Sequence, residues 1–210
     1  QSISYGAVKI QDSFPLVEMM HHPISKDYYY DLKFAKGILQ RISKIRWYSF
    51  LKMQKISAKK INVIVTPSVN SKADIHIDFK VPMENIQVIP NGIDCDIFCP
   101  LPHILSKKHR LITTASADVP LKGLDFLLEA IARLKPEYPD IHLMVIGSPR
   151  KEGHTERLIK KLELEKHVSF KTNLTKEEIT QEYAQSEAAI VSSLYEGFGF
   201  PVGEAMACAT

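Results

Sequence analysis

Two glutamates near the end of the chain flank a stretch of permissive backbone. Glu196 and Glu204 have seven residues between them in 195-YEGFGFPVGEAMACAT-210, and that interval holds three glycines, two aromatic residues and one proline. Glycine lets a backbone approach a ligand closely, and amide N–H groups at a helix N-terminus favour an anion. The pattern predicts that two carboxylates face one bound molecule from opposite sides of a loop.

The glutamate segment must be positioned by a strand before it and a helix after it. The run 188-AAIVSS-193 predicts a buried strand, and Pro201 suits the first position of a helix. Glu196 is then expected at the end of the strand, and Glu204 about one turn into the helix. A single acid near a helix N-terminus is also explained by the helix macrodipole, but that explanation covers Glu204 alone.

Short apolar runs alternate with helical segments along the whole chain. The segment 124-LDFLLEAIARLK-135 places apolar residues on one helical face, and Thr175 with Glu178 forms a capping box at the start of another helix. Alternating strands and helices predict a parallel sheet with helices on both faces. The candidate strands are 14–20, 61–66, 86–89, 110–115, 141–147, 168–170 and 188–193.

A break in the alternation predicts two domains. Three prolines and an Asn-Gly turn occur in 90-PNGIDCDIFCPLP-102, and the alternation restarts at Arg110. We therefore expect one α/β domain over 1–101 and a second over 102–210. The crevice between two such domains is the default place for a ligand.

Composition limits the class of protein. The chain has 210 residues, of which 45% are hydrophobic, so it can bury a sizeable core, and its net charge of +3 indicates no particular partner. No apolar run approaches the roughly 20 residues of a membrane helix, and no signal peptide opens the chain. Cys95 and Cys99 lack the spacing of a zinc or redox motif. A soluble cytoplasmic protein with reduced thiols is expected, and the start at Gln1 predicts a fragment.

Residues 31–60 form a strongly basic stretch. They include nine Lys or Arg and one acid, Asp31, interleaved with Phe34, Trp47 and other large apolar residues. Two interpretations stay open: a basic amphipathic helix in peripheral contact with the anionic inner face of a membrane or near a lipid-phosphate acceptor, and an ordinary solvated face. Nucleic acid is not expected as a partner, because no nucleic-acid-binding motif accompanies the charge.

Several segments carry a resemblance to a known family. They resemble, in order and spacing, the retaining, nucleotide-sugar-dependent glycosyltransferases of family four, also called the glycosyltransferase group 1 family. The resemblance implies a GT-B-like fold, with two Rossmann-like domains and a crevice between them, both truncated here. It also implies transfer of a sugar from a nucleotide-diphosphate sugar to an acceptor hydroxyl with retention of configuration. The segments are 21-HHPISKD-27, 88-VIPNGID-94, 121-LKGLDFLLEA-130, 144-MVIG-147 and 195-YEGFGFPVGEAMA-207.

The resemblance implies roles for the residues around the glutamates. Glu204 matches the residue that hydrogen-bonds the donor ribose, and Glu196 matches the residue that contacts hydroxyls of the donor sugar. The backbone at Phe198, Gly199 and Phe200 would then lie against the sugar and the diphosphate.

Lys122, followed by Gly123, matches the family lysine that binds the donor phosphates. Its position has a physical argument too. A cation at the N-terminus of the helix expected near Leu124 opposes the helix dipole, whereas a bound diphosphate would be attracted by both the lysine and the helix N–H groups. A lysine that simply points to solvent is the alternative.

A histidine pair precedes the proline turn at Pro23. By resemblance one of them touches the transferred sugar, and His22 is favoured over His21 because it adjoins the proline. Ordinary histidines satisfied by backbone hydrogen bonds are the alternative. Ser68 and Ser71 follow the strand expected to end at Thr66 and are candidates to line the same crevice.

One position departs from the family pattern. Ala117 stands where family members usually carry an arginine that pairs with the lysine, and Arg150 is a candidate to replace its charge. This departure keeps open a non-catalytic nucleotide-sugar-binding homologue, weaker donor binding, or help from a neighbouring subunit.

The resemblance also implies metal independence, so neither a metal ion nor another cofactor is expected. The expected partners are a nucleotide-sugar donor and a glycan, lipid-linked or small-molecule acceptor. The catalytic residues are expected to be His22, Glu196 and Lys122. Because the chain looks truncated, we expect these 210 residues to be inactive by themselves.

Overall fold

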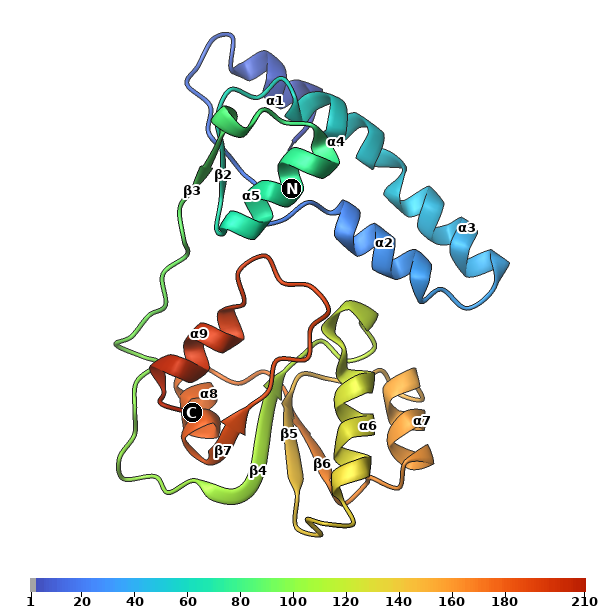
Figure 1. Ribbon diagram of the computed structural model, residues 1–210, viewed down its shortest axis with the longest axis vertical. Helices are drawn as coiled ribbons and strands as arrows, with labels where there is room; N and C mark the ends of the chain where they lie inside the picture. Colours follow the sequence, from blue (N-terminus) through green and yellow to red (C-terminus); the bar gives the residue numbers. More distant parts are fainter. Residues whose placement is uncertain (1–2) are drawn as a thin grey trace. The chain divides into compact units, whose positions relative to one another are not determined.

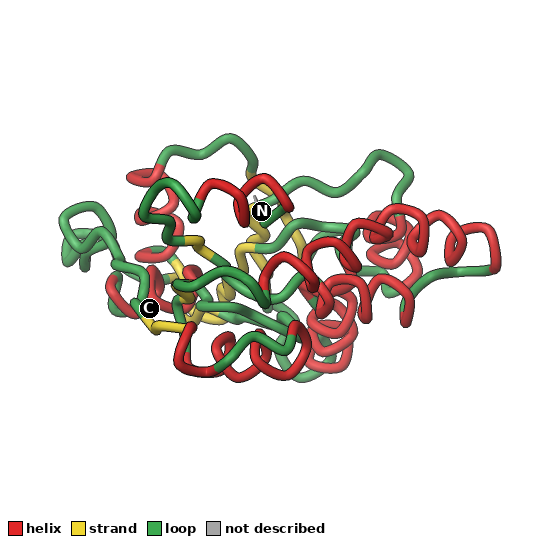
Figure 2. Tube along the Cα trace, turned by 90° about the horizontal axis from the view of Figure 1, so that it is seen from above, coloured by secondary structure: helices red, strands yellow, loops and turns green. Residues whose placement is uncertain are grey.

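The computed structural model describes residues 3–210, which pack into two compact units. Unit 1 comprises the chain up to Asn91 together with Tyr195–Phe198, and unit 2 comprises Gly92–Leu194 and Gly199–Thr210. Each unit contains its own parallel sheet, and helices separate most of its strands along the chain (Figures 1 and 2). The boundary between the units therefore falls within the predicted linker. Four residues of the glutamate segment belong to unit 1, although the residues on both sides of them belong to unit 2.

Unit 1 is built on three parallel strands in the order β1-β2-β3, which are β1 (Glu18–Met19), β2 (Ile64–Thr66) and β3 (Ile86–Val88). The strand predicted over 14–20 is reduced to two residues, because only Glu18 and Met19 pair with β2. The helices of unit 1 are α1 (Tyr5–Ile10), α2 (Ser25–Lys33), α3 (Ile38–Trp47), α4 (Leu51–Ala58) and α5 (Val69–Phe79).

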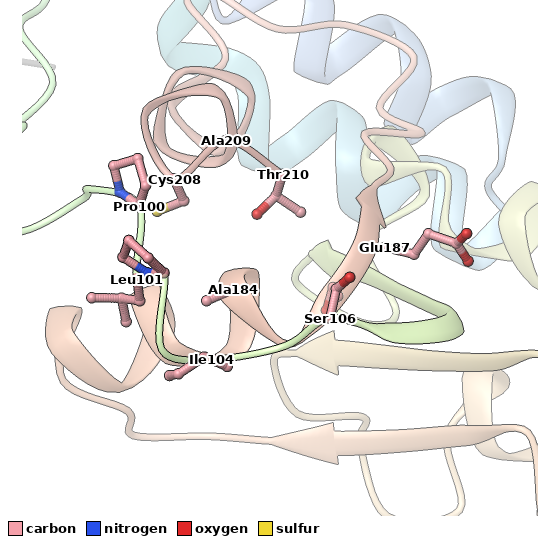
Figure 3. A pocket seen from close by; sticks show the side chains of 11 residues that line it. Pro100, Leu101, Ile104, Ser106, Ala184, Glu187, Cys208, Ala209 and Thr210 are labelled. Carbon is pink, nitrogen blue, oxygen red and sulfur yellow. The ribbon is translucent and has the colours of Figure 1, made fainter.

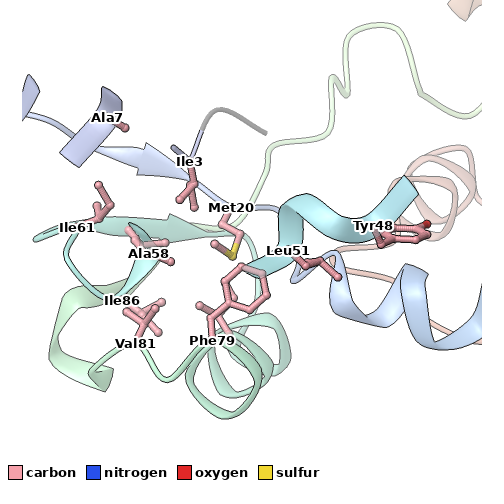
Figure 4. Packing of buried hydrophobic residues seen from close by; sticks show 12 residues of the cluster. Ile3, Ala7, Met20, Tyr48, Leu51, Ala58, Ile61, Phe79, Val81 and Ile86 are labelled. Carbon is pink, nitrogen blue, oxygen red and sulfur yellow. The ribbon is translucent and has the colours of Figure 1, made fainter. Parts of the chain in front are cut away.

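The core of unit 1 lies between its sheet and helices α4 and α5. Figure 4 shows Met20, Leu51 and Phe79 packed together, and all three belong to one buried cluster. Ile61 and Ile86 join the same cluster from the segments before β2 and within β3. Helices α2 and α3 have no buried residue, although Tyr28 of α2 is partly buried and packs against this cluster.

Unit 2 is built on four parallel strands in the order β6-β5-β4-β7. Its strands are β4 (Lys107–Thr114), β5 (His142–Ile146), β6 (Val168–Lys171) and β7 (Ser186–Ala189), and its helices are α6 (Leu124–Leu134), α7 (His154–Lys161), α8 (Lys176–Ala184) and α9 (Phe200–Ala207). Because β-strand side chains alternate between faces, Leu143 and Val145 enter a cluster with α6 and α7, while Met144 enters a second cluster with α8 and α9. The predicted parallel sheet with helices on both faces is confirmed.

Two local predictions hold in unit 2 and one is wrong. The capping box is present: the Glu178 amide donates to Thr175 Oγ1 at 3.2 Å, and the Thr175 amide donates to Glu178 Oε2 at 2.7 Å. Helix α6 covers the predicted segment and buries Leu124, Leu127, Leu128 and Ile131. The buried strand predicted over 188–193 is instead β7 at 186–189, because β7 pairs only with β4 at the sheet edge and the pairing ends there; residues 188–193 are half-buried.

A buried ion cluster joins the strands of unit 2 to α8. Glu182 accepts hydrogen bonds from Arg110 on β4 and, at 2.6 Å, from Lys171 on β6, and Arg110 also donates to Ser186 Oγ at 2.7 Å. Burial alone would raise the pKa of Glu182, but the hydrogen bonds from Lys171 and Arg110 outweigh it and hold the pKa below its ordinary value. We call this set the Glu182 cluster.

Candidate functional site

In unit 2, the loops that follow β4 and β7 are bound to each other. The Leu194 amide donates to the Leu121 carbonyl at 2.8 Å, and Ser192 Oγ donates to the Lys122 carbonyl at 3.0 Å. Gly123 lies so close that a Cβ there would be 2.0 Å from the Ser192 carbonyl oxygen. β4 and β7 are neighbouring parallel strands, so Lys122 is held at their carboxyl edge, beside the segment that leads to the glutamates.

Helices α6 and α9 begin in the same way. The N-cap of α6 is Gly123, with φ of 65°, and the N-cap of α9 is Gly199, with φ of 87°. Both values are in the left-handed region that favours glycine, and glycine supplies no side chain to cap the helix. The positive ends of both helix dipoles are therefore suited to an anionic ligand.

Helix α7 is different because a carboxylate from another loop already caps it. Asp118 Oδ1 accepts from the Thr155 amide at 2.9 Å, and Asp118 Oδ2 accepts from the Arg150 amide at 2.8 Å. Burial alone would raise the pKa of Asp118, but these hydrogen bonds hold it below its ordinary value. Asp118 and Thr155 therefore fasten the loop after β4 to the start of α7, whereas the N-cap residues of α6 and α9 are glycines.

Glu204 is half-buried on α9 and lies near a buried tyrosine. Burial raises the pKa of Glu204 above its ordinary value. The Tyr183 hydroxyl lies 3.5 Å from Glu204 Oε2, 3.4 Å from the Pro201 carbonyl and 3.3 Å from Thr114 Oγ1. Tyr183 is only 1% exposed, and burial raises its pKa to about 12. A neutral phenol thus supports the first turn of α9; sequence reasoning missed it, because nothing near Tyr183 in the chain relates it to α9.

The position that departs from the family pattern lies inside unit 2. Ala117 is buried and belongs to the core cluster that contains Leu124 and Leu127. Arg150 is exposed in the loop after β5, and its backbone amide is fixed by Asp118. A role for the Arg150 side chain in phosphate binding stays a prediction.

In unit 1, the predicted histidine lies in a polar cluster. His22 Nε2 is 2.7 Å from Asp27 Oδ2, and its ring centroid is 5.8 Å from that of Tyr195. His22 is half-buried, whereas His21 is exposed. The choice of His22 over His21, and its contact with a sugar, stay predictions.

The segment Tyr195–Phe198 is anchored within unit 1 on both sides of Glu196. The Tyr195 hydroxyl donates to Asp74 Oδ2 at 2.8 Å, and the Gly197 carbonyl accepts from Ser68 Oγ at 2.6 Å and from Ser71 Oγ at 3.1 Å. A Cβ at Gly197 would lie 2.6 Å from the His21 carbonyl oxygen and 3.2 Å from His22 Cβ. The two serines therefore contact the glutamate segment directly, and Glu196 is held close to the histidine loop.

Pockets occur in both units. A pocket of about 400 Å³ in unit 1 includes Gln54, which is 4% exposed and whose Oε1 has no hydrogen-bond partner among residues 3–210. Its other lining residues are Ile3, Ser4, His22, Ile24, Asp27, Phe50 and Met53. In unit 2, a pocket of about 240 Å³ lies between the Pro100–Ile104 segment and the end of α9 (Figure 3). Its lining includes Ser106 and Ser186, at the amino ends of β4 and β7, so it is not at the strand edge that holds Lys122.

The predicted site residues are divided between the two units. Unit 1 contains His22, Glu196 and Phe198, and unit 2 contains Lys122, Gly123, Gly199, Phe200 and Glu204. No helix within residues 3–210 is both long enough and apolar enough to cross a bilayer.

Comparisons with known proteins agree with the sequence motifs. The family model described as glycosyl transferases group 1 matches residues 102–210, and the model described as glycosyltransferase family 4 matches residues 2–97. The MMP alpha-(1->4)-mannosyltransferase of Mycolicibacterium hassiacum is 39% identical over 100% of this chain and 50% of that protein. A D-inositol 3-phosphate glycosyltransferase of Mycolicibacterium smegmatis is 27% identical over 60% of this chain and 31% of that protein. The chain thus spans half or less of these relatives.

Solved structures show the same fold. Sucrose-phosphate synthase from Thermosynechococcus elongatus aligns with a TM-score of 0.72 and 20% identity over 96% of this chain and 51% of that one. HepE from Anabaena, solved with UDP and glucose, aligns with a TM-score of 0.67 and 19% identity over 96% of this chain and 53% of that one. The predicted GT-B-like fold, with two Rossmann-like α/β units, is confirmed. The family match over 102–210, which is more than half of the chain, shows that this chain belongs to the glycosyl transferases group 1 family.

Proposed function

We propose that the protein transfers a sugar from a nucleotide-diphosphate sugar to an acceptor hydroxyl, with retention of anomeric configuration. The observation that supports this proposal most strongly is in unit 2. There Ser192 and Leu194 hold the loop of Lys122 at the start of α6, whose N-cap glycine supplies no side-chain cap. Helix α9, whose N-cap Gly199 likewise supplies no side-chain cap, carries Glu204 within its first turns. A cation and two helix dipoles suit a diphosphate, and a carboxylate suits the ribose hydroxyls.

The comparisons support this proposal without identifying the substrates. The relatives with the matches above are named as transferases of mannose or of an unspecified sugar, and HepE was solved with UDP and glucose. Those names describe the relatives. This chain spans 50% of the mannosyltransferase, so the activity of the whole protein is part of the proposal.

In the proposed reaction, the bond between the anomeric carbon and the diphosphate oxygen breaks, and a bond from that carbon to the acceptor oxygen forms on the same face. The acceptor proton goes to the departing phosphate oxygen, so no protein base is required. Lys122 and the helix N-termini stabilise the leaving charge, which is the main electrostatic demand of the step. Glu196 and His22 orient the donor sugar, and neither a metal ion nor another cofactor takes part.

The pocket beside His22 is the proposed place for the acceptor. Ile24, Phe50 and Met53 give it apolar walls, and Gln54 Oε1 lacks a donor among the described residues. A buried acceptor atom without a partner is costly, so a ligand hydroxyl that donates to Gln54 would be favoured. A neutral, hydroxyl-bearing acceptor fits these groups, whether it is a glycan, a lipid-linked sugar or a small molecule.

A donor panel tests the proposal. Binding of UDP-, GDP- and ADP-sugars would be measured by calorimetry, and transfer would be assayed with the chain extended to the length of its relatives. We expect one donor class to bind and to be turned over by the extended protein, while the 210-residue chain does not turn it over. Binding without transfer by the extended protein would favour the non-catalytic homologue that Ala117 left open. If no nucleotide sugar binds, both the proposed glycosyltransferase and the non-catalytic nucleotide-sugar-binding homologue are refuted.

A further inference from the structure

Helix α5 of unit 1 holds the glutamate segment on both sides of Glu196. The Gly197 carbonyl accepts from two serine hydroxyls at the N-terminal end of the helix. Further along α5, Asp74 Oδ2 accepts from the Tyr195 hydroxyl. Because Tyr195 and Gly197 are the immediate neighbours of Glu196 in the chain, the backbone of that glutamate is held from both directions.

The Asp74 carboxylate is in turn held by a lysine of α2. Lys26 Nζ lies 2.9 Å from Asp74 Oδ1, and the other carboxylate oxygen is the one that accepts from Tyr195. Lys26 Nζ also lies 3.8 Å from Asp78 Oδ2, which accepts from Ser25 Oγ at 2.7 Å. The hydrogen bond to Asp74 is the largest influence on the pKa of Lys26 and raises it above its ordinary value. Two carboxylates one turn apart on α5 thus hold one cation.

The Tyr195 side chain connects this cluster to the predicted histidine. Its ring centroid is 5.8 Å from the ring centroid of His22 and 5.8 Å from Lys26 Nζ. Burial and the hydrogen bond to Asp74 both raise the pKa of Tyr195 above its ordinary value, so the hydroxyl stays a neutral donor. Tyr195 therefore adjoins Glu196 in the chain and His22 in space.

We propose that Lys26, Asp74 and Tyr195 form a positioning network that fixes Glu196 relative to His22. The proposal rests on the proposed function, in which Glu196 and His22 orient the donor sugar. The three network residues act through Glu196 and are assigned no contact with a substrate. A shift of about 1 Å in a group that orients a substrate lowers a rate by roughly 100-fold, so the network should affect turnover more than folding.

An ion pair that only stabilises the fold is the alternative. The side chains of Lys26 and Asp74 are 27% and 22% exposed, and ion pairs that water reaches contribute little to stability. Residues 195–198, in contrast, lie in neither a helix nor a strand, so no regular backbone ladder fixes them. Side-chain hydrogen bonds from unit 1 supply that order, which favours positioning as the role of the network.

Steady-state kinetics test the role of the Tyr195 hydroxyl in the chain extended to the length of its relatives. Tyr195→Phe should lower kcat for sugar transfer by about 10- to 100-fold and change the donor KM by less than about threefold, because unit 2 is proposed to bind the nucleotide. Asp74→Ala should have the same effect, whereas Asp74→Asn keeps an oxygen that accepts from Tyr195 and should restore kcat to within about threefold. Tyr29→Phe and Asp12→Asn, both exposed in unit 1, are the controls and should change neither constant.

A double-mutant cycle separates positioning from a general effect on the fold. The group to be positioned is absent from Glu196→Ala, so adding Tyr195→Phe to that variant should lower kcat by less than about twofold. If the two losses multiply instead, Tyr195 does not act through Glu196 and the proposal is overturned. An unchanged kcat in Tyr195→Phe, or a loss confined to the donor KM, would overturn it as well.

Amide hydrogen exchange tests the anchoring without relying on activity. In the 210-residue chain, peptides that cover residues 195–199 should exchange at least about fivefold faster in Tyr195→Phe and Asp74→Ala than in the unmodified chain and the two controls. Exchange in α6 should stay the same. Unchanged exchange over 195–199 would refute the network. If the unmodified extended protein transfers no sugar, the proposed function fails, and the exchange result still decides whether the network holds Glu196.

Discussion

Glu204→Gln isolates the charge that we propose for ribose binding. Glutamine has nearly the same size and keeps an oxygen that can accept from Tyr183, whose contact at 3.5 Å is long for a hydrogen bond. Burial raises the pKa of Glu204, which means that the ionised carboxylate is disfavoured where it lies. Replacing it by a neutral amide should therefore leave the free energy of unfolding at neutral pH unchanged or slightly higher.

Donor binding, unlike the free energy of unfolding, should be weakened by Glu204→Gln. Hydrogen bonds to a charged group contribute roughly 1.5–3 kcal/mol, so the dissociation constant of the nucleotide sugar should rise by about 10- to 150-fold. Calorimetric titration of the donor, with urea unfolding of the same samples, measures both quantities. Glu129→Gln removes an exposed carboxylate on α6 and is the control, for which neither quantity should change.

The pH dependence provides a second readout. Because the pKa of Glu204 lies above its ordinary value of 4.5, the carboxylate needed for binding is lost earlier as the pH falls. Donor affinity of the unmodified chain should thus decline on acidification from neutral pH, starting above the range of an ordinary glutamate. The Gln variant should lack this decline. Equal affinity of the two proteins at neutral pH, or the same pH profile in both, would refute the assignment of Glu204.

Lys122→Ala should weaken nucleotide-diphosphate donors at least tenfold while leaving the free nucleoside unaffected in calorimetry, and equal losses for both would exclude a phosphate role. Gly123→Ala combines a φ of 65° with a Cβ 2.0 Å from a backbone oxygen, so the free energy of unfolding in urea should fall by about 1–3 kcal/mol; Gly92→Ala, which meets nothing within 4 Å, is the control. Glu182→Gln should cost about 3–5 kcal/mol, because it leaves the cations of the Glu182 cluster unbalanced. Since the folded pKa of Glu182 is lowered, its contribution is present above the unfolded value of 4.5 and lost as the pH falls through the folded pKa, so acid unfolding curves of the variant should be flatter below pH 4.5.

Local patterns in the sequence predicted many of the elements. The apolar run 141–147 predicted β5, observed at His142–Ile146, and the capping box predicted the start of α8 from residues three positions apart. These features depend on side-chain periodicity and on hydrogen bonds between near neighbours, and both are specified by the local sequence. The motif around Glu196 and Glu204 likewise indicated the family, because its residue types and their spacing lie within one continuous segment.

The lengths of β1 and β7 depended on pairing. The segment 14–20 has the apolar character of a strand, but its length was decided by where β2 offers partners, at Ile64 and Val65. The end of the strand within the run 188–193 was set in the same way by β4, because the pairing of β4 with β7 ends at Ile112 and Ala189. Strand propensity is local, whereas a ladder requires a second segment in register.

Only the tertiary structure decided what surrounds each candidate residue. Gly123 must be glycine because Ser192 packs on it, Tyr183 supports the turn of Glu204, and Ser68 and Ser71 hold Gly197 from more than 120 residues away. The sequence by itself determined which residue types could bind a charged, hydroxyl-bearing donor, since charge and backbone freedom belong to single residues. It could not determine their partners, because contacts between distant segments arise only when strand order and loop closure bring those segments together.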